Sequence, residues 1–292
     1  MASMRQIRSR IRVAKNIQQI TKAMKMVAAA RLRRAQESVE ASRPYSRKLR
    51  EVMARLAASG AGAASHPLLK PLSGTPRRIG VLLVTGDRGL CGSFNSNAIR
   101  RGVELVRGYA VGEVRFVTVG RRGATFFRRR GYTISSELSV ANTGATFAEA
   151  QGVARSAIQI FESGEVDVVY LVYTQFVSAM TQHPMYTQLL PVAPPDGGAA
   201  AAPAGGGEII FEPDAEEILV DLVPRYVETL VFQAILESTA SEHGARMTSM
   251  SAATDNAGKM ISSLTLSLNR ARQAAITKEI AEIVGGADAL KG

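Results

Sequence analysis

Tryptophan is absent from this 292-residue sequence, and cysteine and histidine are almost absent. The single cysteine, Cys91, excludes a disulfide within the chain and a zinc site built from several thiolates, and it favours a reducing compartment. The three histidines, His66, His183 and His243, lie far apart in the sequence without the spacing of metal ligands. We therefore predict no metal site.

The motifs of common catalytic sites are also missing. The sequence contains no nucleophile elbow and no protein-kinase signature, and it lacks the lysine of a phosphate-binding P-loop. No apolar run is long enough to span a bilayer, and the N-terminus has no signal-peptide apolar segment. We therefore predict no catalytic residue, no bound cofactor and no direct insertion into a bilayer.

Acidic residues are scarce at the N-terminal end. The first 55 residues hold fifteen lysines and arginines against three glutamates, a net charge of +12, whereas the whole chain carries +11. Such a basic segment predicts an acidic partner, which can be a nucleic acid, an anionic lipid or an acidic protein surface. An Arg-rich N-terminus superficially resembles a transit peptide, but the helical pattern continues past Arg50 and indicates mature structure.

Residues 1–57 have the pattern of one long helix. Apolar or small residues recur at steps of three and four, which gives a narrow stripe of the coiled-coil type. Ala14, Ile17 and Ile20 step three and three, which predicts a stammer that overwinds the coil locally. Pro44 predicts a break or kink. A helix of this length extends for about 80 Å, so most of it needs partners outside its own domain.

Residues 208–292 form the second predicted helix, kinked or restarted at Pro224 and ended by Gly285 and Gly286. Its apolar positions step four and three in the cleanest heptad stripe of the chain, at Ala257, Ile261, Leu264, Leu268, Ala271 and Ala275. The stripe leads to an apolar tip formed by Ile276, Ile280, Ile283 and Val284. The two terminal helices are predicted to pair as an antiparallel coiled coil.

Residues 77–193 alternate between strand and helix patterns. Continuous apolar runs at 78–85 and 166–174 are typical of buried parallel strands. The alternation predicts a small doubly wound sheet. The fold class is therefore α/β, with a long antiparallel coiled coil of the N- and C-terminal helices plus a small central Rossmann-like α/β domain. Residues 194–207, rich in Pro, Gly and Ala, predict a flexible loop.

A glycine-rich segment, Gly86-Asp-Arg-Gly-Leu-Cys-Gly92, follows the first buried strand, where a Rossmann fold places its phosphate loop. Its spacing, G-x-x-G-x-x-G, departs from the dinucleotide-binding fingerprint. A structural turn with a buried small cysteine is the favoured interpretation. A nucleotide-dependent enzyme built on the central domain is the alternative.

The basic helix raises a further alternative, a coiled coil that binds nucleic acid. In DNA-reading zippers a basic region directly precedes the heptads of a parallel dimer. In this chain basic and apolar positions interleave along one helix, and its partner helix lies in the same chain. The pattern favours a structural and mechanical subunit, and we predict that the partner is not a nucleic acid.

Three segments carry a resemblance to a known family. They are Ile20-Thr-Lys-Ala-Met-Lys-Met-Val27, Asp87-Arg-Gly-Leu-Cys-Gly92, and Ala252-Ala-Thr-Asp-Asn-Ala257 followed by Asn269-Arg-Ala-Arg-Gln-Ala-Ala-Ile-Thr-Lys-Glu-Ile280. In their order and spacing they closely resemble the gamma subunits of F-type ATP synthases, and the resemblance covers essentially the whole chain. It implies a central-stalk rotor, one copy per complex, that couples proton flow to ATP synthesis without a catalytic site of its own.

The resemblance also implies partners and contact residues. The helices would turn inside a ring of three alpha and three beta subunits, and the central domain would meet the epsilon subunit and the membrane c-ring. Lys22, Met24 and Lys25 match a region facing an acidic lever of beta. Arg272 and Gln273 match positions that hydrogen-bond to a catch loop of beta. The tip residues Ile276, Ile280, Ile283 and Val284 match a part held in a hydrophobic bearing.

Two departures from relatives matter. Lys25 stands where many relatives have glutamate, which puts one local polar contact in doubt. The paired cysteines of the plastid form are absent, and no transit-like extension precedes the aligned start. The resemblance therefore favours a bacterial subunit, peripheral to the inner membrane on its cytoplasmic face.

Overall fold

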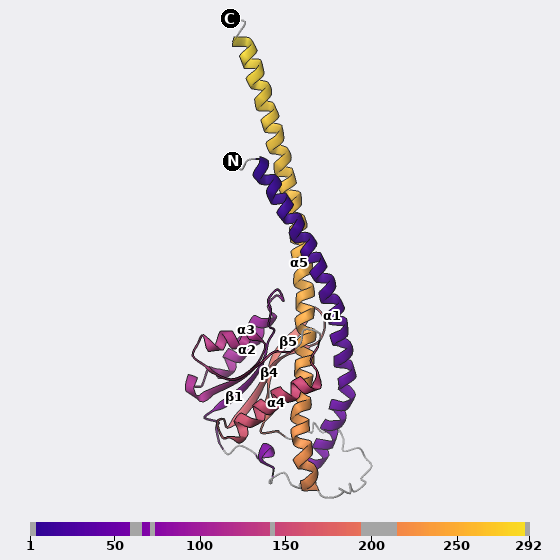
Figure 1. Ribbon diagram of the computed structural model, residues 1–292, viewed down its shortest axis with the longest axis vertical. Helices are drawn as coiled ribbons and strands as arrows, with labels where there is room; N and C mark the ends of the chain where they lie inside the picture. The colour runs from indigo at the N-terminus through magenta and orange to yellow at the C-terminus, as the bar shows by residue number, and fades with distance from the viewer. Residues whose placement is uncertain (1–3, 59–65, 71–73, 141–143, 194–214, 290–292) are drawn as a thin grey trace. The chain divides into compact units, whose positions relative to one another are not determined.

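The computed structural model describes residues 4–58, 66–70, 74–140, 144–193 and 215–289 (Figure 1). The described elements, in chain order, are α1 (Met4–Ala58), β1 (Ile79–Val84), α2 (Phe94–Val106), β2 (Val114–Val119), α3 (Arg121–Arg128), β3 (Thr133–Leu138), α4 (Phe147–Glu162), β4 (Val168–Phe176), β5 (Gln182–Leu190) and α5 (Ala215–Ala289), with short 3-10 helices at Pro67–Leu69 and Val111–Glu113. The predicted α/β class with two long terminal helices is confirmed. The predicted flexible loop at 194–207 and the predicted helix start at 208 lie outside the described residues.

The chain divides into two compact units. The coil unit combines Met1–Ala28 with Met247–Gly292, and the sheet unit comprises Ala29–Arg246. The domain boundaries that the sequence predicts, 1–57, 77–193 and 208–292, follow the elements rather than these units and remain a proposal.

A five-stranded sheet of order β3-β2-β1-β4-β5 lies at the centre of the sheet unit. The first four strands of this order are parallel, and β5 is antiparallel to β4. All six residues of β1 are buried, because β1 has a strand on each side and helices above and below it. This position explains why its sequence is apolar at every residue instead of alternating.

Helices cover both faces of the sheet (Figure 1). On one face α2 and α3 enclose a cluster around Phe116 and Phe127, whose rings stack with centroids 4.1 Å apart. On the other face α4, α5 and the part of α1 within the sheet unit share a second cluster, to which α1 contributes Leu49, Met53 and Leu56. The central domain is therefore doubly wound, as predicted, and its second face is completed by the two terminal helices.

Within the sheet unit α5 is buried on several sides. Ile235 packs in the core, while Ser238 and Ser241 face the end of β4. The Thr174 N–H donates to Ser238 Oγ at 3.1 Å, and Ser241 Oγ donates to the Thr174 carbonyl at 3.2 Å. These two bonds fix α5 to a strand of the sheet, so in this unit the helix is part of the folded core.

In the coil unit α1 meets α5 along a regular seam. The seam positions of α1 are Ile7, Ile11, Ala14, Gln18, Thr21, Lys25 and Ala28, at steps of four and three. Ile17 and Ile20 are 47% and 58% exposed, so the predicted stammer is wrong. Thr21 takes the seam position because its hydroxyl has a partner there, with Thr254 Oγ1 2.8 Å from Thr21 Oγ1. The α5 stripe from Ala257 to Ala275 is buried or half-buried, as the heptads predict.

The long helices do not break or end at the prolines and glycines where the sequence predicts an interruption. Helix α1 continues through Pro44, and α5 continues through Pro224 and through Gly285 and Gly286. A proline costs roughly 3 kcal/mol inside a helix because it removes one hydrogen bond and crowds the preceding turn. Near both prolines the helices pack against the sheet unit's core, where Leu49 and Val223 are buried, and this packing outweighs the local cost.

Glu237 of α5 makes folding of the sheet unit depend on pH. It is 6% exposed, and burial raises the pKa of its carboxyl, which the Gln233 amide donating to Oε1 at 3.2 Å only partly offsets. At a pH between the carboxyl's pKa in the unfolded chain and its raised pKa in the folded chain, the folded state keeps a proton that the unfolded state releases. The free energy of unfolding therefore falls as the pH rises through this range. We expect Glu237→Gln to stabilise the protein at neutral pH by about 1 kcal/mol, which is roughly 2–4 °C in melting temperature.

Thermal denaturation at a series of pH values tests this expectation. The gain should shrink as the pH falls below the unfolded pKa, where both variants are neutral at this position. Glu40→Gln is the matched control, because Glu40 is exposed on α1. A gain that is equal at acidic and neutral pH contradicts the role of the Glu237 charge.

Candidate functional site

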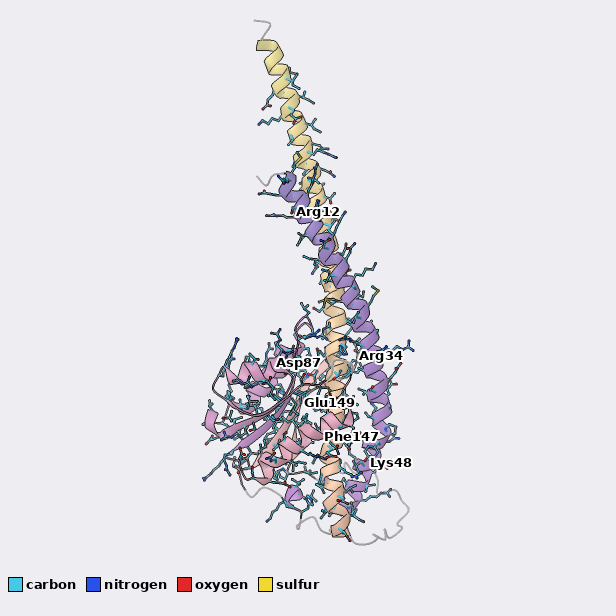
Figure 2. All side chains as sticks on the ribbon, in the orientation of Figure 1. Arg12, Arg34, Lys48, Asp87, Phe147 and Glu149 are labelled. Atoms are coloured by element: carbon cyan, nitrogen blue, oxygen red, sulfur yellow. The ribbon has the colours of Figure 1, made fainter. Side chains whose placement is uncertain are left out.

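The basic residues of the coil unit form the first candidate surface. Seven lysines and arginines of α1 are here called the basic flank: Arg5, Arg8, Arg10, Arg12, Lys15, Lys22 and Lys25. All seven are exposed, and none takes part in an ion pair among the described residues. Figure 2 labels one of them, Arg12. In the described part of this unit the ion pair is Lys278–Glu282, at 3.4 Å. The charge of the flank is therefore available to an acidic surface outside the chain.

The predicted lever-facing residues lie on adjacent turns of α1 with different surroundings. Lys22 is exposed and Met24 is half-buried. The Lys25 ammonium donates to Ser251 Oγ of α5 at 3.0 Å. Lys25 therefore occupies a seam position and links the two helices, a contact that the local sequence pattern does not reveal.

The predicted catch residues, Arg272 and Gln273, are exposed on α5. The structure does not bring them together with Lys22, because the seam pairs Thr21 with Thr254, eighteen residues before Arg272. At 1.5 Å per residue this is about 27 Å along the helix. The two predicted contacts would thus lie at two levels of the coil.

The tip of α5 extends beyond the N-terminal end of α1 (Figure 1). Its apolar residues are exposed, at 49% for Ile276, 56% for Ile280, 72% for Ile283 and 53% for Val284. A solvent-exposed apolar helix end that no described residue covers is typical of a surface that another protein covers.

Exposed apolar side chains also accompany the basic flank. They are Val13, Ile17, Ile20, Met26 and Val27 on α1, with Met260 and Leu266 on α5. The sequence pattern assigns Ile17, Ile20 and Val27 to the seam, because it takes every apolar residue for a packing residue. The exposed fractions show instead that these side chains face outward and add apolar surface to a charged face.

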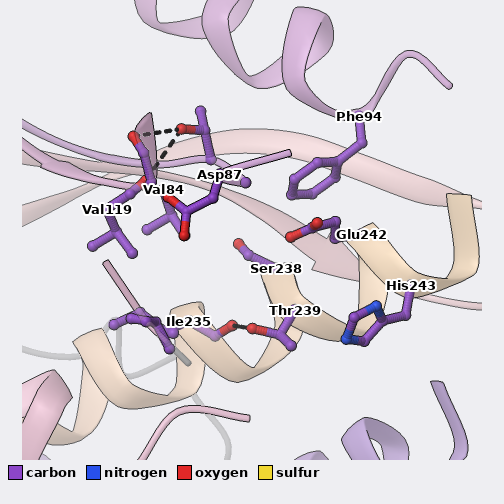
Figure 3. Close-up of a pocket in the computed structure, with 13 residues that line it drawn as sticks. Val84, Asp87, Phe94, Val119, Ile235, Ser238, Thr239, Glu242 and His243 are labelled. Carbon is purple, nitrogen blue, oxygen red and sulfur yellow. Dashed lines mark hydrogen bonds between the residues drawn. The ribbon is translucent and has the colours of Figure 1, made fainter. Parts of the chain in front are cut away.

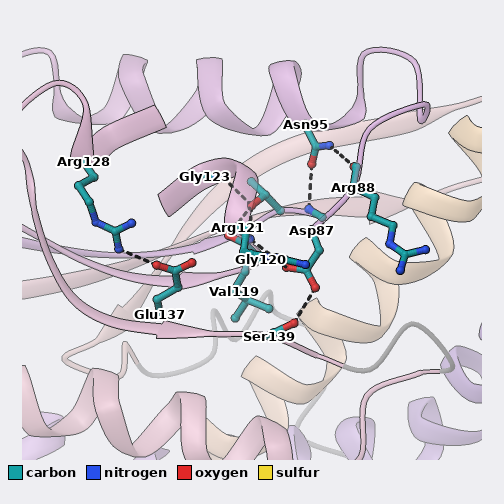
Figure 4. Close-up of polar contacts among 12 residues, drawn as sticks. Asp87, Arg88, Asn95, Val119, Gly120, Arg121, Gly123, Arg128, Glu137 and Ser139 are labelled. Atoms are coloured by element: carbon teal, nitrogen blue, oxygen red, sulfur yellow. Dashed lines mark hydrogen bonds and ion pairs between the residues drawn. The ribbon is translucent and has the colours of Figure 1, made fainter. Parts of the chain in front are cut away.

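The glycine loop from Gly86 to Gly92 is held by hydrogen bonds of its own unit (Figure 4). The Gly86 N–H donates to Asn95 Oδ1 at 2.8 Å. The Asp87 carboxylate accepts from the Arg121 N–H at 3.0 Å and from Ser139 Oγ at 2.6 Å. Asp87 thereby supplies the acceptor at the start of α3 that a phosphate would supply in a nucleotide site.

Helix α5 fills the space in front of this loop (Figure 3). A Cβ atom at Gly86 would lie 2.9 Å from the Glu242 carboxylate. Arg246 donates to Glu242 Oε1 at 2.5 Å and to the Gly89 carbonyl at 3.4 Å. The remaining cavity is about 30 Å³, the space of about one water molecule. A negative carboxylate and the absence of room both oppose a nucleotide phosphate, so the geometry favours the structural turn.

Cys91 belongs to this turn. It is 1% exposed, and burial, together with the nearby Glu242 carboxylate, raises the pKa of its thiol. A buried thiol with a raised pKa is a poor nucleophile at neutral pH. The geometry thus agrees with a packing role for the cysteine. None of the described helices has a stretch long and apolar enough to cross a membrane.

Comparison with known proteins identifies relatives of this chain. A family model described as ATP synthase matches residues 3–290. The ATP synthase gamma chains of Desulfitobacterium hafniense and Pelotomaculum thermopropionicum are 51% and 48% identical to this chain, each over the full length of both chains.

Solved structures with a similar fold come from mitochondrial ATP synthases. A chain of the Euglena gracilis enzyme superposes with a TM-score of 0.67 at 18% identity, covering 98% of this chain and 94% of that chain. A chain from the central stalk and c-ring structure of Tetrahymena thermophila gives a TM-score of 0.59 at 24% identity, covering 80% of this chain and 99% of that chain. At these identities the similarity shows a common fold.

Proposed function

The chain belongs to the ATP synthase family and, within it, to the gamma chains, and we propose that it turns as the central rotor that couples proton flow to ATP synthesis. The rotor transmits rotation of a membrane c-ring to the beta subunits, whose sites open, loosen and tighten in sequence. The chain contributes no catalytic site of its own. Its partners are a ring of alpha and beta subunits, the epsilon subunit and the c-ring, at the cytoplasmic face of a bacterial membrane.

One observation carries this proposal: the coil unit satisfies its seam internally while its outer surface is left for partners. The seam residues of α1 pair with α5, yet the basic flank has no ion pair within the described residues. Exposed apolar residues surround the flank and the tip. A two-helix rod with an outward-facing binding surface suits a part that stays rigid while it presents different sides to the surrounding ring.

A rotor must not bind any angular position too tightly. Two unit charges 4 Å apart attract by about 1 kcal/mol in water and about 4 kcal/mol at an effective dielectric constant of 20. Lysines and arginines facing acidic levers would thus give forces that vary with angle without deep energy minima. Stiffness comes from the seam and from the bonds that fix α5 to the sheet unit's β4. Torque therefore depends mainly on shape and stiffness, with charge as a secondary contribution.

This division of roles predicts weak effects of single charge removals. Lys22→Ala and Lys25→Ala should each lower torque only modestly in a complex reconstituted with alpha and beta subunits, because one exposed ion pair is worth about 1 kcal/mol or less. Torque measured on single rotating complexes checks this. Near-total loss of rotation in either variant, with the complex still assembled, would contradict it.

Co-purification is the experiment that tests the proposed function itself. The tagged chain should hold alpha and beta subunits in a stable complex, and the ATPase activity of that complex should depend on the chain. The basic N-terminal segment predicts an acidic partner, and DNA is one candidate for it. We expect the chain to prefer the alpha and beta subunits over DNA at physiological salt, where non-specific DNA binding weakens steeply. A chain that neither assembles with the ring nor changes its ATPase activity is not its rotor.

A further inference from the structure

A pocket of about 420 Å³ lies in the sheet unit, and none of its lining residues belongs to the glycine loop. Three helices form it: α1, α4 and α5. Its volume falls within the range of sites that bind small molecules or single side chains. Its lining consists of three aromatic residues and six polar ones: Tyr45, Phe147 and Phe232, with Ser42, Ser46, Gln151, Arg225, Glu228 and Thr229.

A buried carboxylate is the strongest chemical feature of this pocket. Glu228 is 6% exposed, and Gln151 Nε2 donates to its Oε2 at 3.0 Å. Glu228 forms no ion pair among the described residues, although Arg225 lines the same pocket one helical turn earlier. A buried charge that lacks a counter-ion is costly, and a bound cation would lower that cost.

The hydroxyl groups of the pocket also favour a ligand that donates hydrogen bonds. Ser46 Oγ donates to the Ser42 carbonyl at 3.2 Å, and Thr229 Oγ1 donates to the Arg225 carbonyl at 2.8 Å. Ser42 Oγ likewise donates to the Val39 carbonyl at 2.9 Å. Because these hydrogens point to the helix backbone, the hydroxyl oxygens are left as acceptors. Together with the carboxylate they fit a ligand that brings several N–H groups.

The aromatic residues supply the remaining part of such a site. Phe147 and Phe232 contact each other edge to face, with ring centroids 5.5 Å apart, and Tyr45 completes the wall. Phe147 and Tyr45 are 40% and 55% exposed, so their rings are accessible from solvent (Figure 2 labels Phe147). Aromatic faces attract cations and also cover an apolar stem.

We propose that this pocket binds a primary ammonium group carried on an apolar stem, with Glu228 as its counter-ion. The ammonium has three donors for the carboxylate and hydroxyl oxygens, and the stem packs against Phe147, Phe232 and Tyr45. The same chemistry occurs in a free organic amine and in the lysine side chain of a partner subunit. None of its lining residues belongs to the basic flank or to the tip, and the proposal does not depend on the rotor function.

The first test compares a charged and a neutral probe on the full-length chain by calorimetric titration. 2-Phenylethylammonium should bind with a Kd on the order of 1 mM, and 2-phenylethanol, which has the same stem, at least about tenfold more weakly. Equal binding of the two probes would show that the pocket recognises only the apolar stem and would overturn the proposal.

Three variants and a control locate the site. Glu228→Gln should weaken ammonium binding about tenfold or more, and Phe147→Leu several-fold, because the aromatic face is lost. Arg225→Gln should tighten binding, since it removes a competing positive charge, whereas an anion site would lose affinity. Glu104→Gln on α2 should change nothing. If Glu228→Gln fails to fold, Phe147→Leu and Arg225→Gln still test the proposal. An unchanged affinity for 2-phenylethylammonium in both of these variants contradicts it.

The assembled complex distinguishes the two sources of the ammonium group. A partner lysine seated in the pocket would block the probe in the complex but not in the isolated chain. A site for a free amine would bind the probe equally in both. Each of these results supports the pocket chemistry and names its source.

Discussion

Replacing Gly120 with alanine is expected to lower the melting temperature of the sheet unit by roughly 10 °C or more, a loss on the order of 4 kcal/mol. Gly120 precedes α3 with φ +88°, and a Cβ atom there would lie 2.0 Å from the Thr85 carbonyl oxygen. That oxygen belongs to the backbone of the residue directly after β1, so no side-chain rotation relieves the clash. Thermal denaturation followed by circular dichroism measures the loss.

Gly131 offers the matched control, since it follows α3 with a similar φ of +83°. A Cβ atom there meets one side-chain atom, of Val111, at 3.9 Å, which is ordinary contact. Gly131→Ala should therefore cost only the backbone strain of about 1–2 kcal/mol. If both alanine variants lose the same stability, the close approach of β1 and the α3 start is not as the structure shows.

A disulfide across the coil seam is the second large effect that we expect. With Cys91 replaced by alanine, cysteines at Thr21 and Thr254 should oxidise almost completely, because the two hydroxyl oxygens they replace are 2.8 Å apart. Cysteines at Ile20 and Thr254 should not pair within the chain, since Ile20 is 58% exposed on the outer side. Non-reducing electrophoresis separates the two outcomes.

The same disulfide has a functional consequence. Both helices of a rotor turn together, so a covalent link between them should leave ATPase-driven rotation intact. If the cysteines at Ile20 and Thr254 pair efficiently and those at Thr21 and Thr254 do not, the stammer is present and the whole seam moves by one residue. Loss of rotation on oxidation, reversed by a reductant, would mean that the two helices must move past each other.

The central sheet could be predicted from sequence because its strands are apolar throughout. β1, with all of its residues buried, has the continuous pattern that a strand covered on both faces requires. The seam of the coil unit is harder to predict from sequence, because Gln18 and Thr21 are polar and the adjacent apolar residues Ile17 and Ile20 look like better packing residues. A pattern of apolar residues cannot distinguish a seam from a partner-binding face on the same helix. The hydroxyl pair of Thr21 and Thr254, 233 residues apart, decides it.

The glycine loop shows a similar limit. Its sequence leaves a phosphate site open, and the deciding groups are Glu242 and Arg246, more than 150 residues later in the chain. Their positions depend on how α5 packs across the sheet, which no local motif encodes. The helix continuity at Pro44 has the same origin, since tertiary packing outweighs the local cost of a proline. The contact roles of Lys22, Met24, Arg272 and Gln273 rest on family resemblance and remain predictions.

Direct observation of rotation tests whether this chain is the rotor. A bead is attached through Gly108→Cys, an exposed site after α2 with open space around its Cα, in the Cys91→Ala background, with the alpha and beta ring fixed to a surface. We expect ATP to turn the bead in one direction, and we expect the variant with the oxidised Thr21–Thr254 cysteine pair to turn it equally well. ATP hydrolysis by the assembled ring with a bead that stays still would contradict the assignment of this chain as the rotor.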